Sequence, residues 1–84
     1  MDEQNVRWDD LRVVLAIHAA GSLSGAARRL GLSHATVFRR LDGIERRLGV
    51  SLFVRGRRGY TPTPAGEDMA ATGARVEREV LGAE

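Results

Sequence analysis

The sequence predicts a mainly helical domain in which three helices are followed by a short β-hairpin and a longer final helix. Two observations lead to this prediction. Apolar residues recur at spacings of three and four over most of the chain, which is typical of amphipathic helices. Between residues 52 and 63 this period is lost, and two short runs rich in β-branched and aromatic residues flank Gly56-Arg-Arg-Gly59, which is typical of a hairpin with two arginines at its tip.

The first helix is expected from Trp8 to Ala20. Asp9 and Asp10 fall in its first turn, where carboxylates suit the positive end of the helix dipole. His18 is expected to be packed or solvated rather than metal-bound, because His34 is the only other histidine. One apolar stripe is expected on this helix, formed by Trp8, Leu11, Val14, Leu15 and His18.

Two further helices are expected from Leu23 to Leu30 and from His34 to Leu48. Ser22 and Ser33 stand where each helix needs an N-cap, and Gly31 can adopt the left-handed conformation at the end of the earlier helix. Small alanines let the two helices approach closely. This is the outline of a helix-turn-helix, whose second helix lies in the major groove of DNA.

The helix from residue 34 to residue 48 has two different sides. Steps of four, three and four residues bring together the apolar side chains of Val37, Leu41, Ile44 and Leu48. The opposite side carries Ala35, Arg39, Asp42 and Arg46, with Thr36 and Phe38 at its margins. The first half of this side therefore offers a set of side chains that suits a DNA groove.

The last helix is expected to begin with Thr63 as N-cap and Pro64 in the first turn, and to run to about Leu81. Pro62 lacks a backbone N–H, so its strand should be an edge strand. The helix has a narrow seam with coiled-coil spacing, formed by Met69, Gly73, Val76 and Val80. A long helix with so thin a seam is rarely stable alone in water, so we expect it to pair with a second chain. The alternative is a helix that packs on its own domain.

Positive charge is concentrated in the middle of the chain. The segment from Arg28 to Arg58 holds nine arginines and two acids, a net charge of +7, whereas the flanks hold four arginines and nine acids, a net charge of −5. All thirteen basic residues are arginine, whose planar fork suits phosphates and guanine edges, although a GC-rich genome would give the same bias. This distribution favours a polyanionic partner more than the total of +2 suggests.

Length and composition exclude several classes. A chain of 84 residues makes one domain with a small core, and the lack of cysteine excludes disulfides, thiolate metal sites and cysteine nucleophiles. The longest apolar stretch, residues 13–20, is too short to cross a bilayer, and the acidic N-terminus is unlike a secretory signal. We therefore expect a soluble cytoplasmic protein with no membrane partner, no metal and no other cofactor.

An ordered set of motifs in this chain resembles the N-terminal domain of LysR-type transcriptional regulators. The matching residues are Ser22, Ala26-Ala27, Leu30, Ser33, Val37, Ile44-Glu45, Leu48-Gly49, Leu52-Phe53-x-Arg55 and Thr63-Pro-Ala-Gly66. No single motif is specific, but together they extend from about Trp8 over nearly the whole chain.

The resemblance implies a winged helix-turn-helix in residues 1–63 and a linker helix for dimerisation in residues 64–84. It also implies a homodimer that binds double-stranded DNA, at an interrupted inverted repeat in promoters of the nucleoid. Such regulators normally continue into a larger domain that binds a co-inducer. We therefore expect an isolated DNA-binding fragment or a stand-alone truncated member, with no small-molecule ligand in this chain.

Each residue of the expected DNA interface is assigned to a base edge, a phosphate or the wing contact. We expect base edges to be approached by His34, Ala35, Thr36, Phe38 and Arg39, and phosphates to be contacted by Ser22, Ser33, Arg40 and Arg55. We expect the two arginines of the wing tip, Arg57 and Arg58, to reach a minor groove or its phosphates. The alternatives are that Phe38 packs against the second helix, that both serines only cap helices, and that the wing tip is a solvated turn. Glu45 is expected to be structural and paired with a nearby arginine such as Arg55.

The chain departs from the family pattern at positions that commonly face DNA. His34-Ala35 replaces a frequent Gln-Pro, Phe38 replaces a frequent serine, and Arg40 replaces a frequent glutamine. The fold and the functional class therefore carry over, whereas the target sequence does not.

Three other interpretations compete with this one. Molybdate-responsive winged-helix regulators share part of the pattern, but the Leu-Phe-x-Arg and Thr-Pro-Ala-Gly motifs favour the LysR type. A protein-interaction module, in which the arginines only keep the protein soluble, would show no steep loss of DNA binding with salt. An enzyme is the weakest candidate, because the sequence has no glycine-rich phosphate loop and no clustered histidines or carboxylates at ligand spacing.

Overall fold

The computed structural model describes residues 7–82, which form four helices and one two-stranded antiparallel sheet. The elements follow in the order α1 (Trp8–Ala20), α2 (Leu23–Leu30), α3 (His34–Leu48), β1 (Phe53–Gly56), β2 (Gly59–Pro62) and α4 (Pro64–Gly82). This confirms the expected fold of a helix-turn-helix, a hairpin wing and a long final helix. The two strands lie within one residue of the expected positions.

The helices begin and end at the expected capping residues. The Ser22 and Ser33 hydroxyls accept hydrogen bonds from backbone N–H groups in the first turns of α2 and α3, at 3.0 and 3.1 Å. Thr63 caps α4 in the same way at 3.1 Å. Gly31 ends α2 with a φ of 70°, which glycine adopts without strain, and this lets the chain turn directly into α3.

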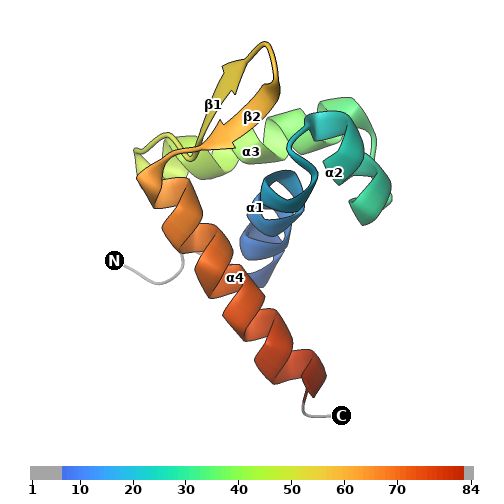
Figure 1. Ribbon diagram of the computed structural model, residues 1–84, viewed down its shortest axis with the longest axis vertical. Coiled ribbons are helices and arrows are strands. Elements are labelled where there is room, and N and C mark those ends of the chain that lie inside the picture. Colours follow the sequence, from blue (N-terminus) through green and yellow to red (C-terminus); the bar gives the residue numbers. More distant parts are fainter. Residues whose placement is uncertain (1–6, 83–84) are drawn as a thin grey trace.

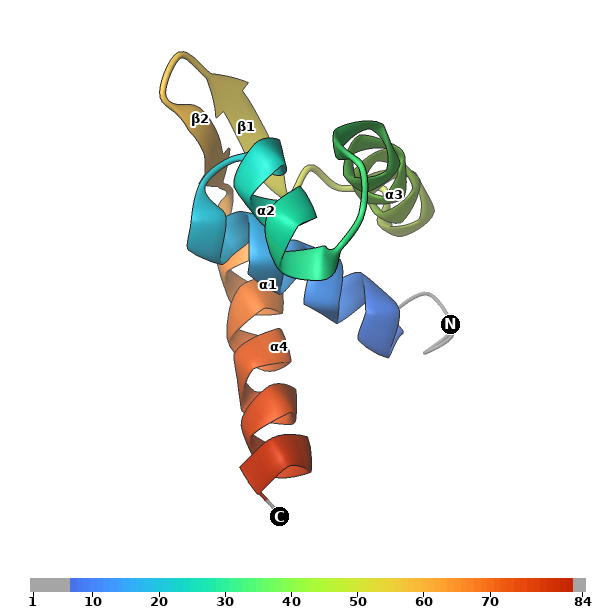
Figure 2. The same cartoon turned by 90° about the vertical axis from the view of Figure 1, so that its right-hand side faces the viewer.

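The first helix, α1, lies in the middle of the molecule and is contacted by α2, α3 and α4 (Figures 1 and 2). The prediction of a single stripe is wrong here, because Trp8 is 38% exposed and His18 is only half-buried. A helix that is covered from several sides needs apolar residues around much of its circumference. Its buried apolar residues are Leu11, Val13, Val14, Ala16 and Ile17.

A partly buried ion pair joins α1 to the end of α3. The Asp10 carboxylate is almost fully buried, and it accepts hydrogen bonds from the Arg47 guanidinium and, at 3.3 Å, from the backbone N–H of Arg7. A buried carboxylate without a partner would be strongly destabilising. The pair therefore restricts how far α3 can shift on α1.

The final helix, α4, packs on α1 of its own chain and then extends away from the hairpin (Figure 1). A Cβ atom at Gly73 would lie 3.2 Å from the carbonyl oxygen of Leu11, so this glycine allows the two helices to approach closely. Met69 packs against the core, and the His18 imidazole meets the Glu67 carboxylate at 3.0 Å.

This packing differs from the expected interchain seam. Gly73 and Met69 face α1 and the core of their own chain, because α1 is an apolar helix that α4 must help to cover. Val76 is half-buried and Val80 is exposed. Gly73 is thus the buried member of the expected seam, whereas Met69 and Val76 keep part of their surface and Val80 keeps most of it.

Candidate nucleic-acid interface

The two helices of the helix-turn-helix are held together through buried apolar residues. Ala26 of α2 and Val37 of α3 are fully buried. In the connection between the helices, the backbone N–H of Leu32 donates to the Ala27 carbonyl at 3.0 Å. The inward faces of α2 and α3 are therefore fixed, and with them the side of α3 that faces solvent.

The first half of α3 presents a mixed surface to solvent. His34, Ala35 and Arg39 are exposed, and Thr36 is half-buried. The Thr36 hydroxyl oxygen accepts hydrogen bonds from the Ser33 hydroxyl at 2.8 Å and from the Arg39 guanidinium at 3.4 Å. Because these bonds are exposed to water they are weak, so Arg39 is oriented along the helix but remains free to exchange partners.

The second half of α3 is electrostatically different from the first. Arg46 pairs with Asp42 one turn earlier at 3.0 Å, and Arg47 pairs with Asp10 of α1. Both cations are therefore partly neutralised by a neighbouring carboxylate. Within the described part of the chain, Arg39 and Arg40 are the arginines of α3 that form no salt bridge.

The hairpin is attached closely to the turn between α1 and α2. The backbone N–H of Tyr60 donates to the Gly21 carbonyl at 3.0 Å. A Cβ atom at Gly59 would lie only 2.3 Å from that carbonyl oxygen, and Gly59 has a φ of 113°, so a residue with a side chain would force the strand away. The rings of Phe53 and Tyr60 meet edge to face at 6.4 Å and support the hairpin from below its tip.

The Glu45 carboxylate links α3 to the first strand. Its Oε2 accepts hydrogen bonds from the backbone N–H groups of Leu52 at 2.8 Å and Phe53 at 3.4 Å. The predicted pairing of Glu45 with Arg55 is therefore wrong, although the structural role is right. The physical reason is that the Leu52 backbone is buried, and a buried N–H requires an acceptor more strongly than an exposed guanidinium does.

The wing arginines lie at the same end of the molecule as α3. Arg55, Arg57 and Arg58 are all exposed, and the last two occupy the turn between β1 and β2. Figures 1 and 2 show the hairpin and α3 together at one end, whereas α4 runs in the opposite direction. The fold thus brings the exposed half of α3 and the arginine-tipped hairpin to one face.

A cleft lies between α2, the start of α3 and the hairpin. Its lining includes hydroxyl groups, an imidazole and two guanidinium groups, from Ser22, Leu23, Ser24, His34, Arg55, Gly56, Arg57, Gly59 and Tyr60. The first turn of α2 adds backbone N–H groups and the positive end of a helix dipole. Ser24 also lines this cleft but is absent from the predicted site residues, although its place in the first turn of a capped helix was an available signal.

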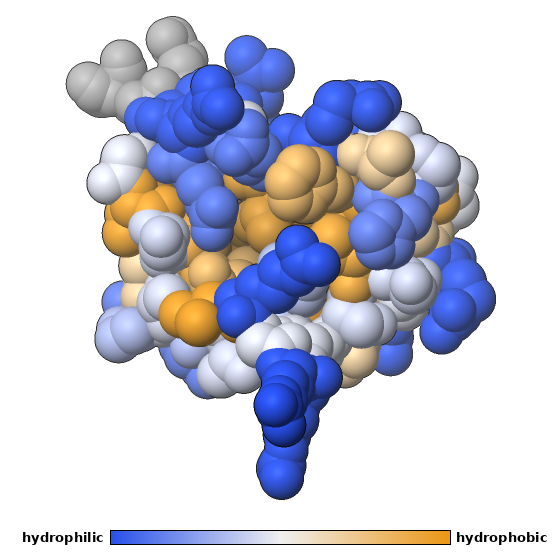
Figure 3. Space-filling view, turned by 90° about the horizontal axis from the view of Figure 1, so that it is seen from above, coloured by the Kyte–Doolittle hydropathy of each residue, from blue (hydrophilic) through white to orange (hydrophobic). Residues whose placement is uncertain are grey.

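Most arginines of the basic segment from residue 28 to residue 58 form no salt bridge within the described residues. Of the nine arginines between residues 28 and 58, only Arg46 and Arg47 form salt bridges within residues 7–82. The remaining seven are Arg28, Arg29, Arg39, Arg40, Arg55, Arg57 and Arg58. Seen from above, hydrophilic side chains surround a band of apolar surface that crosses the face (Figure 3). Such a surface suits a polyanion with both phosphates and apolar groups.

Not every predicted site residue lies at the cleft. Arg40 is exposed on the other margin of α3, where it lines a hollow together with Asp9 and Arg12 of α1. Phe38 is 47% exposed, and the hollow that it lines is shared with the hairpin residues Phe53 and Tyr60 rather than with α2. The alternative in which Phe38 is covered by α2 is therefore not supported.

The described residues hold neither a metal-binding cluster nor a membrane-spanning helix. Residues 7–82 contain no group of three or more histidine, cysteine, aspartate or glutamate side chains that could hold a metal ion. Within the same range, no helix has the length and apolar character needed to cross a membrane.

The sequence is similar to those of known bacterial regulators. The chain is 50% identical over 64 residues to an uncharacterized HTH-type transcriptional regulator of Mycobacterium tuberculosis, which corresponds to 76% of this chain and 20% of the relative. It is 52% identical over 59 residues to the small neutral protease regulatory protein of Streptomyces coelicolor, covering 70% of this chain and 18% of the relative. The chain thus spans about a fifth of the length of the curated relatives it matches.

Solved structures of similar chains have the same fold. The LysR family transcriptional regulator CbnR superposes with a TM-score of 0.80 and 31% identity, over 92% of this chain and 26% of that chain. The BenM DNA-binding domain in complex with benA site 1 DNA superposes with a TM-score of 0.83 and 25% identity, over 92% of this chain and 90% of that chain. A family model described as "Bacterial regulatory helix-turn-helix protein, lysR family" matches residues 8–67. The chain therefore belongs to the lysR family of bacterial regulatory helix-turn-helix proteins.

Proposed function

We propose that this chain is a sequence-specific, double-stranded DNA-binding domain of a transcriptional regulator, with α3 in the major groove. The observation that carries the proposal is the shared face of the exposed half of α3 and the arginine-tipped hairpin (Figures 1 and 2). The similar domains of CbnR and BenM, both solved in complex with DNA, support it. Such a protein acts at promoters in the cytoplasmic nucleoid.

The residues of this face divide into readers of bases and binders of phosphate. His34, Ala35 and Arg39 lie on the exposed first half of α3, the part of a recognition helix that contacts base edges. Thr36 is half-buried, and its hydroxyl accepts a bond from Ser33 and a long one from Arg39, so we assign it no base contact of its own. An arginine so placed suits the bidentate acceptor pair of guanine.

Phosphate contacts are assigned to the cleft and the wing. Ser22, Ser24 and Arg55 line the cleft at the start of α2, where hydroxyl, guanidinium and backbone N–H groups converge. The Ser22 and Ser33 hydroxyls already cap helices, but a capped N-terminus itself attracts phosphate, so both roles are compatible. Arg57 and Arg58 extend from the hairpin turn toward phosphates or a minor groove, and Arg40 serves phosphates on the other margin of α3.

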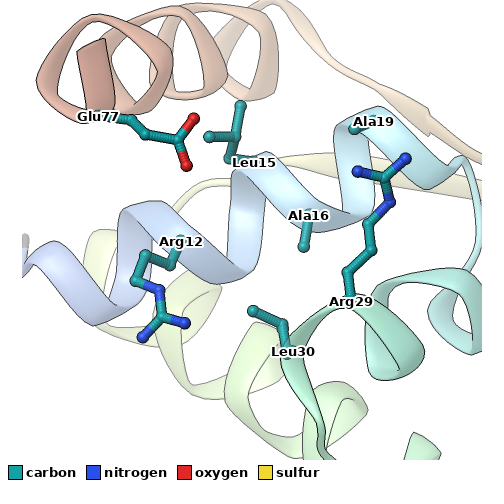
Figure 4. A pocket seen from close by; sticks show the side chains of 7 residues that line it. All are labelled: Arg12, Leu15, Ala16, Ala19, Arg29, Leu30 and Glu77. Atoms are coloured by element: carbon teal, nitrogen blue, oxygen red, sulfur yellow. The ribbon is translucent and has the colours of Figure 1, made fainter. Parts of the chain in front are cut away.

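The proposal includes a homodimer formed through α4. Val76 and Val80 keep surface on this helix. Figure 4 shows a groove between α1, α2 and α4 that combines apolar and charged side chains, from Arg12, Leu15, Ala16, Ala19, Arg29, Leu30 and Glu77. Apolar contacts ringed by both charge signs suit a second copy of an equally mixed helix. Two copies would then bind the two halves of an inverted repeat.

The dimer is tested by sedimentation equilibrium over a range of chain concentrations. Val80→Glu should shift the chain toward monomer, because it places a carboxylate in the interface. The matched control is Glu79→Ala, an exposed residue of the same helix, which should leave the association constant nearly unchanged. Equal behaviour of the two variants contradicts a role for this part of α4.

DNA binding is tested by selection from a random duplex library, followed by titration at 50 and 200 mM salt. The expected result is a recovered inverted repeat, and a loss of affinity with salt that reflects about 0.9 released counterions per neutralised phosphate. A protein-interaction module predicts no enriched sequence and little change with salt. That result would refute the proposed function.

A further inference from the structure

Phe38 is a large apolar side chain on the face that the proposed function assigns to DNA. It is 47% exposed, although it follows directly after the fully buried Val37. Single exposed apolar residues are common on protein surfaces, so exposure alone indicates no ligand. Its position is the informative part, because it lies in the first half of α3 and turns toward the hairpin.

Phe38 lies at the margin between the hydrophobic core and the exposed side of α3. The hollow that it lines is completed by Leu41, Asp42 and Glu45 of α3 and by Phe53, Arg55 and Tyr60 of the hairpin. Both carboxylates already have partners, since Asp42 pairs with Arg46 and Glu45 accepts from the backbone N–H of Leu52. Figure 3 shows that apolar surface crosses the middle of this face between hydrophilic borders. Two exposed arginines lie near Phe38, since Arg55 lines the same hollow and Arg39 is the next residue on α3.

The major groove offers one apolar group to such a side chain. Each base pair exposes hydrogen-bond donors and acceptors there, and only thymine adds a C5-methyl group. A phenyl ring gains by burying that methyl group. Against another base it would cover polar atoms that lose water without gaining a partner, which is unfavourable. One residue can therefore select for thymine in two ways.

We propose that Phe38 is a specificity-determining residue that contacts the C5-methyl group of one thymine in each half of the DNA site. This inference rests on the proposed function and names one base that the site must contain. Arg39, the next residue on α3, is assigned a separate hydrogen-bonding role. The methyl-bearing base could also be 5-methylcytosine, which presents the same group in the groove, and the test separates the two.

The test uses the duplex recovered by selection, with each thymine replaced in turn by deoxyuridine, which lacks only the methyl group. At one position per half-site, wild-type affinity should fall about fourfold, which corresponds to about 0.8 kcal/mol for one buried methyl group. At that position the replacement should change the affinity of Phe38→Ala by less than about twofold. Two further duplexes carry cytosine and 5-methylcytosine at the same position and show whether the methyl group alone suffices. The wild-type chain should bind the 5-methylcytosine duplex more tightly than the cytosine duplex, but less tightly than the thymine duplex.

Val50→Ala is the matched control, because it also removes exposed apolar atoms, but beyond the end of α3. It should keep the full sensitivity to deoxyuridine. Thermal melting checks that Phe38→Ala folds, as the exposure of this side chain leads us to expect. The inference is overturned if deoxyuridine weakens wild type and Phe38→Ala equally, or if no thymine methyl group affects wild-type binding. Absence of any DNA binding by the wild-type chain would instead refute the proposed function.

Discussion

Replacing Glu45 by alanine should destabilise the chain, because this carboxylate bridges α3 and the first strand of the wing. It accepts hydrogen bonds from the backbone N–H groups of Leu52 and Phe53, at 2.8 and 3.4 Å. Leu52 is 1% exposed, so its N–H would have difficulty finding water after the substitution. The bond from Phe53 is long and is expected to contribute little.

The expected magnitude follows from the cost of one buried donor that loses its acceptor. That cost is about 1–3 kcal/mol, so we expect the free energy of unfolding to fall by about 2 kcal/mol. For a domain of this size, such a change lowers the Tm by about 8–16 °C. Glu45→Gln retains an oxygen acceptor but loses the charge, so it should recover roughly half of the difference, since charge-assisted bonds are about twice as strong.

Urea denaturation of the three chains measures these differences, with Asp42→Ala as the matched control. Asp42 is a second carboxylate on α3, and within residues 7–82 its one salt bridge is an exposed pair with Arg46. Its removal should change the free energy of unfolding by less than about 0.5 kcal/mol. If Glu45→Ala loses no more stability than Asp42→Ala, the bridge between α3 and the wing is not a stabilising contact.

Three further predictions concern the face and the packing of α4. Arg57→Ala should reduce the slope of log affinity against log salt by about one unit on every DNA sequence. The control Arg75→Ala, at an exposed position of α4, should leave the slope unchanged. If Arg57→Ala has the same slope as wild type, the wing is not part of the interface. Arg39→Ala should reduce the difference in binding free energy between the preferred base and the other bases at one position of the selected site by about 1–3 kcal/mol. If affinity falls equally on all DNA sequences, Arg39 contacts a phosphate instead. Gly73→Val should lower the free energy of unfolding by about 1–3 kcal/mol at any chain concentration, because the new side chain meets Leu11 of the same chain. Ala71→Val, at an exposed position of α4, should lower it by less. A loss of stability that disappears at high chain concentration would place Gly73 between chains instead.

The local signals in the sequence were sufficient for the helices and their ends. Ser22, Gly31, Ser33 and Thr63 act through bonds to their own neighbours, so their roles can be predicted without knowing the fold. The same holds for the exposed side of α3, because the buried set that begins with Val37 defines the opposite side. This is why most of the candidate face could be named from the sequence.

The contacts between distant segments could not be predicted in this way. Periodicity reports that a helix has an apolar side but not which element covers it, so the seam at Gly73 was assigned to a second chain although α1 covers it. The partner of Glu45 was missed for a related reason, since a buried backbone N–H seven residues away gives no signal in the sequence. Asp10 appeared to serve the helix dipole, whereas its main partner, Arg47, lies 37 residues away.

The central claim is that one face, formed by the first half of α3 and the hairpin, binds DNA. Amide chemical shifts of the 15N-labelled chain, titrated with the selected duplex, test it residue by residue. We expect the largest changes in residues 33–40 and 55–60, with small changes over the exposed side of α4. Changes concentrated on α4, with residues 33–40 and 55–60 unaffected, would contradict the claim.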